Sequence, residues 1–365
     1  MSYNWSNSSA NSTTGEHYWS ASFDKILLAT SMALISVVGI IGNSLVIFIV
    51  LKNRKMRSVT NLYIVSLAWT DIMFLVFCGI TTTTVPVTKD WIFGQFMCPF
   101  VSYMQFVTIQ ATCGTLTALT VDRYRVITSP LKSMAKRTFK KTMLLIAFIW
   151  IGSACLHIPI PIFVKEKTEN GYRYCYREFP DMLSDRIYQI YAFISTYLLP
   201  LLIIGLCSGL ILRVLWSQHE NSRVLNKNKD EERVRKQKWR VTKMVFTVAG
   251  VFACSWAPIH IMNMWFLLDP HYPLTSIPLF YFRNFCLCLS YANSAMNPFV
   301  YALSGRNYRR HLRRMFRKNK HRGLRGSITA TTYTSTMTTS VRLPGENGKG
   351  GYERCDKFES LDTLT

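Results

Sequence analysis

The stretch ATCGTLTALTVDRYRV, from Ala111 to Val126, decides how the chain is interpreted. Its first half carries small and apolar residues, which suit the interior of a helix bundle. Asp122 and Arg123 then stand side by side where the apolar run ends. Such a charge pair is costly near a membrane unless it lies at an interface or serves a function. A lone arginine there can also extend its charge to the membrane surface without having a function. The rest of the chain is needed to choose between these two interpretations.

The composition indicates a protein that crosses a membrane several times. Of the 365 residues 49% are hydrophobic, yet the formal net charge is +23. A nucleic-acid-binding protein can be equally basic, but it does not alternate its charge with long uncharged apolar blocks. No nucleic-acid partner is therefore expected. Each block is close to the roughly 20 residues that an α-helix needs to cross a bilayer.

Seven such blocks are predicted to be transmembrane helices, since backbone groups in lipid must be hydrogen-bonded within their own segment. They run approximately over residues 26–51, 61–83, 98–128, 142–160, 186–216, 241–268 and 277–303. We therefore expect an all-α membrane protein whose seven-helix bundle occupies residues 25–304.

The loops predict the orientation. Basic segments follow the first, third, fifth and seventh blocks, and lysine and arginine mark the cytoplasmic side. The polar tail over residues 1–24, expected to be disordered, contains glycosylation sequons at Asn4, Asn7 and Asn11. Both observations place the N-terminus outside the cell and the C-terminus in the cytoplasm.

The segment after the seventh block is predicted to be a short amphipathic helix over residues 305–318, lying on the inner membrane surface. Its apolar residues recur at helical spacing: Tyr308, Leu312, Met315 and Phe316. Residues 319–365 are expected to form a disordered cytoplasmic tail. Its Ser/Thr-rich part, residues 327–340, is a candidate for phosphorylation and arrestin recruitment.

Taken together, these features resemble the rhodopsin-like (class A) G-protein-coupled receptors over roughly residues 26–317. The motifs that carry the resemblance are Gly42-Asn43, Leu67-Ala-x-x-Asp71, Cys98, Asp122-Arg123-Tyr124, Trp150, Pro200, Phe252-x-x-x-Trp256-x-Pro258 and Asn297-Pro298-x-x-Tyr301. Within that class, the stretches 91–98, 110–123 and 289–298 look like those of kisspeptin receptors, with galanin and A-type allatostatin receptors as near relatives.

The resemblance implies a plasma-membrane receptor for an extracellular neuropeptide, with a heterotrimeric G protein, receptor kinases and arrestin as partners. A kisspeptin-like amidated peptide and Gq/phospholipase C signalling are expected, with a galanin- or allatostatin-type ligand as the alternative. An enzyme is not expected, because no nucleophile–base set stands out. A transporter or channel is the alternative from another class, although the chain shows neither an inverted repeat nor paired broken helices.

By the same resemblance, a set of residues is assigned to G-protein coupling and activation. These are Asp122, Arg123, Tyr124, Phe252, Trp256, Pro258, Asn297, Pro298 and Tyr301. Many such receptors also hold the arginine with an acid on the sixth helix, but Lys238 stands there in this sequence and would repel it, or else face water or lipid phosphate. Ser208 stands where most relatives have a tyrosine that reaches toward this arginine.

Two further sites are implied. Cys98 and Cys175, both on the expected oxidising side, are predicted to form a disulfide rather than to remain free thiols. Asp71 lies in an apolar helix, where a carboxylate must be paired, protonated or metal-bound. The resemblance surrounds it with oxygen-bearing side chains: Asn43, Thr112, Asn293, Ser294 and Asn297. They suit either a sodium ion in the resting state or a water-filled cluster, and no other cofactor is expected.

The ligand pocket is expected between the outer halves of the helices. Its predicted lining residues are Gln105, His260, Asn263, Arg283 and Tyr291, each of which could instead bond a neighbouring helix. Gln105 replaces the aspartate of amine receptors, and Tyr291 replaces the lysine that binds retinal in opsins. Small amines and a Schiff-base chromophore are therefore not expected as ligands.

Overall fold

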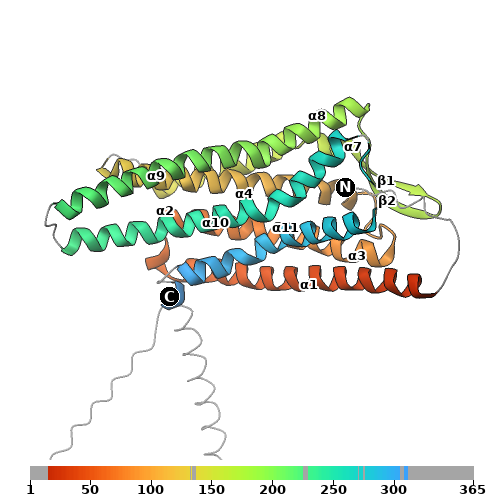
Figure 1. Ribbon diagram of the computed structural model, residues 1–365, viewed down its shortest axis with the longest axis horizontal. Coiled ribbons are helices and arrows are strands. Elements are labelled where there is room, and N and C mark those ends of the chain that lie inside the picture. The colour runs from red at the N-terminus through yellow and green to blue at the C-terminus, as the bar shows by residue number, and fades with distance from the viewer. Residues whose placement is uncertain are drawn as a thin grey trace, which may run out of the picture. The chain divides into compact units, whose positions relative to one another are not determined.

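The computed structural model describes residues 15–131, 133, 137–224, 229–269, 271–273, 276–304 and 308–310, with side chains except at 15–24, 55, 218–224, 229–238 and 304. Its long helical segments are α1 (Gly15–Lys52), α2 (Val59–Phe74) continued by η2 (Leu75–Gly79) and α3 (Ile80–Thr88), α4 (Met97–Thr128), α6 (Phe139–Leu156), α8 (Met182–Phe193) continued by η3 (Ile194–Leu198) and α9 (Leu199–Val224), α10 (Lys229–Leu268) and α11 (Ile277–Ser304). They follow the seven predicted blocks in order and run side by side (Figure 1).

The first helix corrects one predicted boundary. α1 begins at Gly15, whereas a disordered tail was expected up to residue 24. Once a long helix exists, adding residues to its end is far easier than starting a new one. Residues 15–24 contain no proline, and Glu16 suits the positive end of the helix dipole. The polar composition of this stretch was therefore a poor guide to its conformation.

The outer surface of the bundle is apolar. On α6, Leu144, Phe148 and Ile151 are 70%, 71% and 64% exposed, whereas Ser153 on the same helix is buried. A soluble monomer rarely exposes such a patch, which suits contact with lipid. Five segments of the described chain are long and apolar enough to cross a membrane: Lys25–Lys52, Val59–Thr88, Phe139–Phe163, Met182–Ser217 and Trp239–Leu268.

The two remaining segments, α4 and α11, are long but more polar. α4 lies at the centre of the bundle, where it packs against α2, α6, α9 and α10. Its threonines and charged pair, and the asparagines of α11, therefore face other helices rather than lipid. Their lower hydropathy reflects the polar interior that the two helices build.

Capping residues set where several helices begin. The side chains of Ser58, Thr138 and Asp181 accept hydrogen bonds from backbone amides three residues later, at the starts of α2, α6 and α8. Each cap satisfies one of the amides that a helix start leaves without a partner. η1 (Arg54–Met56) fills the short connection before α2.

A β-hairpin covers one end of the bundle, which we call the hairpin end (Figure 1). After the short helix α7 (Pro159–Phe163), β1 (Val164–Glu169) pairs antiparallel with β2 (Tyr172–Arg177), with Glu166 opposite Cys175. Asn170 and Gly171 both have positive φ, at 52° and 81°, as a two-residue hairpin turn requires. These strands were not predicted: an Asn-Gly pair favours a hairpin turn, but β1 before it is mostly charged and lacks the alternating apolar pattern of a strand.

Two π-helical turns, η2 and η3, interrupt the second and fifth segments. A π-turn disturbs the regular helical bonding and often marks a functional position. Carbonyls in both turns accept bonds from other helices: Tyr291 Oη donates to Cys78 O at 3.3 Å and Gln110 Nε2 to Ser195 O at 3.2 Å. The turns thus join neighbouring helices near the middle of the bundle.

Some predicted features lie outside the described residues. They are the sequons at Asn4, Asn7 and Asn11, most of the amphipathic segment 305–318, and the tail 319–365. Within the amphipathic segment, residues 308–310 are described; they are helical, with Tyr308 buried and Arg309 exposed.

Candidate functional site

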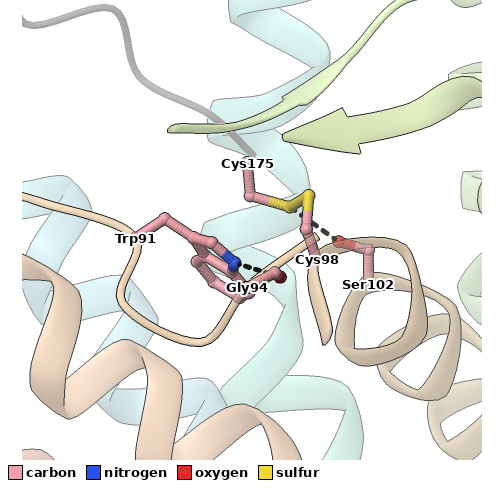
Figure 2. The surroundings of a disulfide bond; sticks show 5 residues. All are labelled: Trp91, Gly94, Cys98, Ser102 and Cys175. Carbon is pink, nitrogen blue, oxygen red and sulfur yellow. Dashed lines mark hydrogen bonds between the residues drawn. A yellow bond between two sulfur atoms is a disulfide. The ribbon is translucent and has the colours of Figure 1, made fainter. Parts of the chain in front are cut away.

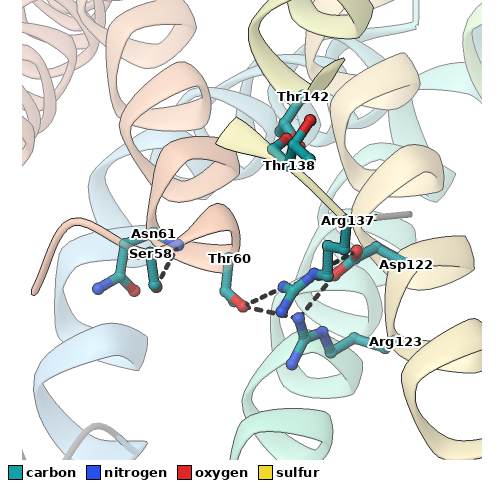
Figure 3. A network of polar contacts seen from close by, with 8 residues as sticks. All are labelled: Ser58, Thr60, Asn61, Asp122, Arg123, Arg137, Thr138 and Thr142. Atoms are coloured by element: carbon teal, nitrogen blue, oxygen red, sulfur yellow. Dashed lines mark hydrogen bonds and ion pairs between the residues drawn. The ribbon is translucent and has the colours of Figure 1, made fainter. Parts of the chain in front are cut away.

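The end of the bundle opposite the hairpin contains Asp122 and Arg123, and we call it the arginine end. Arg123 is 7% exposed, and its Nη2 donates to Asp122 Oδ2 at 2.6 Å and to Thr60 Oγ1 at 2.6 Å. The charge pair predicted from the sequence is therefore formed, with Arg123 buried and Asp122 slightly exposed. Thr60, from the first turn of α2, is a partner that the sequence analysis missed (Figure 3).

A second arginine completes this network. Arg137, in the connection between α4 and α6, donates from Nε to Asp122 Oδ1 and from Nη2 to Asp122 Oδ2, both at 2.8 Å. Its Nη2 also donates to Thr60 Oγ1 at 2.8 Å (Figure 3). Nothing in the sequence distinguishes Arg137 from the other cations of that basic segment, so only the fold reveals its role.

The sixth segment does not contribute a described partner to this network. The side chain of Lys238, on α10, lies outside the described part of the chain. Among the side chains that the structure does describe, none on α10 forms an ion pair with Arg123. The arginine end is thus held by α2, α4 and the segment before α6.

Asp71 is buried in the middle of the bundle, at 1% exposure. Asn297 Nδ2 donates to its Oδ2 at 2.8 Å, which brings together two residues of the predicted sodium site. Asn43, on α1, donates to Ser294 O at 2.9 Å and so ties α1 to the same part of α11. Thr112 Oγ1, from the predicted set, donates to Thr70 Oγ1 at 3.0 Å.

Several buried oxygens near Asp71 have no hydrogen-bond partner among the described residues. They include Oδ1 of Asn43, Asn293 and Asn297. A cavity of about 10 Å³, room for roughly one water molecule, is lined by Thr112, Asn293 and Ser294 together with Phe74, Thr108, Ile109, Phe252 and Trp256. No group of three or more His, Cys, Asp or Glu suited to a metal occurs in the described chain. The amide and hydroxyl oxygens around one carboxylate do fit a small hard cation.

An aromatic column runs from this cavity toward the hairpin end. The ring centroids of Phe252 and Trp256 lie 6.1 Å apart, those of Trp256 and His260 5.8 Å, and those of His260 and Tyr197 4.5 Å. Tyr197 Oη donates to Ala253 O at 2.8 Å, which joins η3 to α10. The column includes both aromatic residues predicted to link ligand binding to activation.

The predicted pocket residues differ in how they are engaged. Nε2 of His260 and Oδ1 of Asn263, one turn apart on α10, are buried and have no hydrogen-bond partner among the described residues. The Tyr291 hydroxyl, by contrast, bonds Thr82 Oγ1 at 2.7 Å as well as the Cys78 carbonyl, so it joins helices. Gln105 and Arg283 are half-buried on α4 and α11.

The predicted disulfide is confirmed. Cys98 and Cys175 are bonded, with their Cα atoms 5.4 Å apart, and this bond joins the start of α4 to β2. The Trp91 indole Nε1 donates to Gly94 O at 2.9 Å in the loop that leads to α4 (Figure 2). This loop and the hairpin therefore form one tethered cover at the hairpin end.

An ion pair strengthens that cover. Arg173 Nη2 lies 2.7 Å from Asp90 Oδ2, and the Arg173 amide donates to Asp90 Oδ1 at 2.6 Å. The hydrogen bonds from Arg173 hold the pKa of Asp90 below its usual value, and Asp90 raises the pKa of Arg173. Trp91 N also donates to Arg173 O at 2.8 Å. The hairpin is thus fixed two residues from the disulfide.

The inner half of α11 packs closely on α1. A Cβ atom at Gly42 would lie 2.9 Å from Cγ of Pro298, so only glycine allows this approach. Tyr301 is 1% exposed, and its hydroxyl has no partner among the described residues. The predicted Asn297-Pro298-x-x-Tyr301 motif therefore begins within the Asp71 cluster, at Asn297, and continues along α11 to Tyr301.

Comparison with known proteins agrees with this geometry. Residues 42–301 match the family model described as 7 transmembrane receptor (rhodopsin family). The chain is 40% identical over 301 residues to G-protein coupled receptor 54 of Oreochromis niloticus, covering 80% of this chain and 79% of that protein. It is 34% identical over 313 residues to the KiSS-1 receptor of Homo sapiens, covering 84% and 78%.

A galanin receptor is also similar. The chain is 32% identical over 287 residues to galanin receptor type 1 of Rattus norvegicus, covering 78% of this chain and 80% of that protein. These matches confirm the predicted seven-helix fold and a receptor rather than an enzyme, and they do not support a transporter or channel. The chain belongs to the rhodopsin family of seven-transmembrane receptors, in the group that contains the KiSS-1 and galanin receptors.

Proposed function

We propose that this receptor binds an extracellular amidated neuropeptide of the KiSS-1 type and activates a heterotrimeric G protein, with Gq and phospholipase C as the expected route. Similarity to the KiSS-1 receptor supports the ligand class. The observation that carries the proposal is the buried Arg123, held by Asp122 at the end opposite the tethered hairpin. An arginine that is buried and paired with a single acid can be released from that acid when the helices of the bundle change their packing.

The expected sequence of events follows from the contacts. A peptide would enter at the hairpin end and reach the unpartnered polar atoms of His260 and Asn263. His260 lies on the aromatic column, so a shift there would be passed to Trp256 and Phe252. The proline at position 258 gives α10 a point at which its inner half can swing outward. Arg123 would then be free to contact the G protein.

Sodium would stabilise the resting state in this scheme. Asp71, Thr112, Asn293, Ser294 and Asn297 are proposed to hold the ion, which would supply a positive charge beside a buried carboxylate. Unpartnered oxygens of Asn293 and Asn297 support this assignment. A water-filled cluster at the same place is the alternative, and substitution of Asp71 distinguishes the two.

The receptor is further proposed to lie in the plasma membrane with its N-terminus outside, where Asn4, Asn7 and Asn11 would be glycosylated. Receptor kinases and arrestin would act on the cytoplasmic tail. The basic segments after the first, third, fifth and seventh helices support this orientation.

One experiment tests the proposed function. The receptor would be expressed in cells and challenged with KiSS-1, galanin and allatostatin-A peptides, each amidated and as the free acid, with calcium and cyclic AMP as readouts. A calcium response to amidated KiSS-1 peptide, lost in Arg123→Ala while peptide binding remains, is expected. A response to galanin or allatostatin-A alone would change the ligand, and a cyclic AMP response alone would change the G protein.

A further inference from the structure

Asp122 is shared between two arginines, but it does not hold them equally. Arg137 contacts both carboxylate oxygens, whereas Arg123 contacts Oδ2 alone. The side chain of Asp122 is 12% exposed and those of Arg123 and Arg137 are 8% and 25% exposed, so the group is largely shielded from water. A two-pronged arginine–carboxylate contact fixes orientation as well as distance.

We propose that Arg137 is a positioning residue of the resting receptor: it orients the Asp122 carboxylate so that this carboxylate holds Arg123 against Thr60. The inference rests on the proposed function, because it concerns the same activating arginine. Among the described residues no hydrogen bond joins Arg137 to Arg123; the two are connected through Asp122 and Thr60. Removing Arg137 leaves Asp122 free to rotate, which weakens the restraint on Arg123 and favours the active state.

The opposite effect would follow if Arg137 competed with Arg123 for the carboxylate. The geometry argues against competition. An ionised carboxylate has about four acceptor positions, and the two arginines use three of them. The Thr60 hydroxyl has two lone pairs and accepts one bond from each arginine. Both arginines therefore bind the same two groups at once, and neither has to leave for the other to bind, although Nε of Arg123 has no partner among the described residues.

The location of Arg137 determines which segments the restraint on Arg123 connects. Arg137 immediately precedes Thr138, which caps α6, while Asp122 belongs to α4 and Thr60 to α2. The network therefore joins three neighbouring segments and includes no described residue of α10. An outward swing of α10 does not break the network directly. The network stabilises the resting state by holding Arg123, so loosening it shifts the equilibrium toward the state in which α10 has moved outward.

The test measures ligand-free signalling, normalised to receptor at the cell surface, in Arg137→Gln, Asp122→Asn and the double variant. Loss of one charged hydrogen-bonding partner is expected to shift the resting–active equilibrium about tenfold. Arg137→Gln should therefore raise basal signalling, and so should Asp122→Asn. The double variant should rise by less than the sum of the two single changes, because two of the three bonds from Arg137 go to that carboxylate and one goes to Thr60.

Two further variants serve as controls. Lys140→Gln removes the same charge three residues away from an exposed side chain, and it should leave basal signalling unchanged. Arg137→Lys keeps the charge but loses the planar fork, so it should give an intermediate value. A fall in basal signalling in Arg137→Gln, an additive double variant, or an equal rise in Lys140→Gln would each overturn the proposal.

A second readout does not depend on G-protein coupling. Spin labels would be attached to the purified full chain at Lys52→Cys and Arg240→Cys, both exposed at the arginine end, after the exposed Cys155 and Cys254 and the tail residue Cys355 are replaced by serine. Without ligand, Arg137→Gln should populate longer distances than the parent, and Lys140→Gln should not. If this holds while no peptide elicits signalling, the proposed function fails and the positioning role stands. Unchanged distances in a receptor that does signal would reject the positioning role alone.

Discussion

Arg137 binds Asp122 with two parallel hydrogen bonds of 2.8 Å, although the two residues lie in different segments of the chain. Asp122 belongs to α4, the helix whose other end bears the disulfide-bonded Cys98. A helix of this length spans about 48 Å, so one rigid element connects the tethered hairpin with the buried Arg123. A change in how ligand packs against α4 at the hairpin end can therefore change the contacts of Arg123 at the other end, without movement of the hairpin itself.

The disulfide is expected to support both folding and ligand response. Cys98→Ala or Cys175→Ala should lower surface expression and peptide potency together, since such a bond contributes about 2–4 kcal/mol. Quantitative surface labelling and a dose–response curve measure the two effects. Replacing the buried but unbonded Cys78 with alanine is the matched control. Wild-type expression and potency in both single variants would reject a role for the bond.

The ion pair between Asp90 and Arg173 should matter mainly for ligand entry. Asp90→Asn and Arg173→Gln should each reduce peptide affinity, whereas the exchanged pair Asp90→Arg with Arg173→Asp should recover part of it. Surface expression should change less than in the cysteine variants, because the disulfide still tethers the hairpin. Radioligand binding on intact cells measures the effect, and an exchanged pair weaker than both single variants would contradict it.

The pH dependence of this pair has a definite sign. Because Arg173 lowers the pKa of Asp90 in the folded receptor, the stabilisation is present above the usual carboxyl pKa of 3.8 and is lost as pH falls through the lower folded value. Acidification from pH 7 to pH 5 should therefore leave the contribution of the pair intact. The ratio of peptide affinities between wild type and Asp90→Asn should stay constant over that range.

The sodium assignment predicts an ion-specific effect on agonist binding. Replacing a large inert cation with sodium at fixed ionic strength should lower agonist affinity, because sodium binds the resting state. Asp71→Asn should abolish this dependence. Thr81→Ala removes a buried hydroxyl that bonds only carbonyls of its own helical segment, so it is the control and should retain the dependence. The same sodium effect in wild type and Asp71→Asn would favour the water-filled cluster.

The fold was largely predictable because the bilayer imposes one length and one hydrogen-bonding solution on each apolar block. The motif residues were also predictable, and Asp71–Asn297 and Asp122–Arg123 do form contacts. The contacts made by residues outside the recognised motifs were not predictable. Arg137 lies in a run of cations and Thr60 in an ordinary first helical turn, so their contact with Asp122 exists only in three dimensions.

Two local features, the β-hairpin and the role of Tyr291, were not determined from the sequence. The hairpin was not predicted although Asn170-Gly171 is a clear turn pair. Its first strand, Val164–Glu169, is mostly charged and lacks the alternating apolar pattern that predicts a strand. Tyr291 was assigned to the ligand pocket, while the structure gives its hydroxyl two helix partners. Sequence spacing alone cannot show whether a buried tyrosine contacts ligand or bonds a neighbouring helix.

The tail is expected to terminate signalling. Residues 327–340 should be phosphorylated after activation, and the added charge should recruit arrestin through its basic surface. Truncation after Gly326 should reduce arrestin recruitment while leaving the first calcium response intact. Truncation after residue 345, which keeps the Ser/Thr-rich part, is the control. Unchanged recruitment in the shorter chain would contradict the assignment.

Lys238 should make the resting state of this receptor less favoured than in relatives with an acid at that position. It stands eighteen residues before Trp256 on α10, where an acid would attract Arg123. A lysine instead repels the arginine by about 1 kcal/mol where solvent penetrates. The restraint on Arg123 then depends on Asp122, and measurable ligand-free signalling is expected.

Substitution at this position tests the idea directly. Lys238→Glu should lower ligand-free second messenger per surface receptor and shift the agonist curve to higher concentration, because the new acid favours the closed state. Lys238→Gln removes the charge without adding an attraction and should give a smaller fall. Asp122→Ala should raise the same ratio. If Lys238→Glu leaves it unchanged or raises it, the lysine faces water or lipid phosphate, and Arg123 is held at rest by α2, α4 and Arg137 alone.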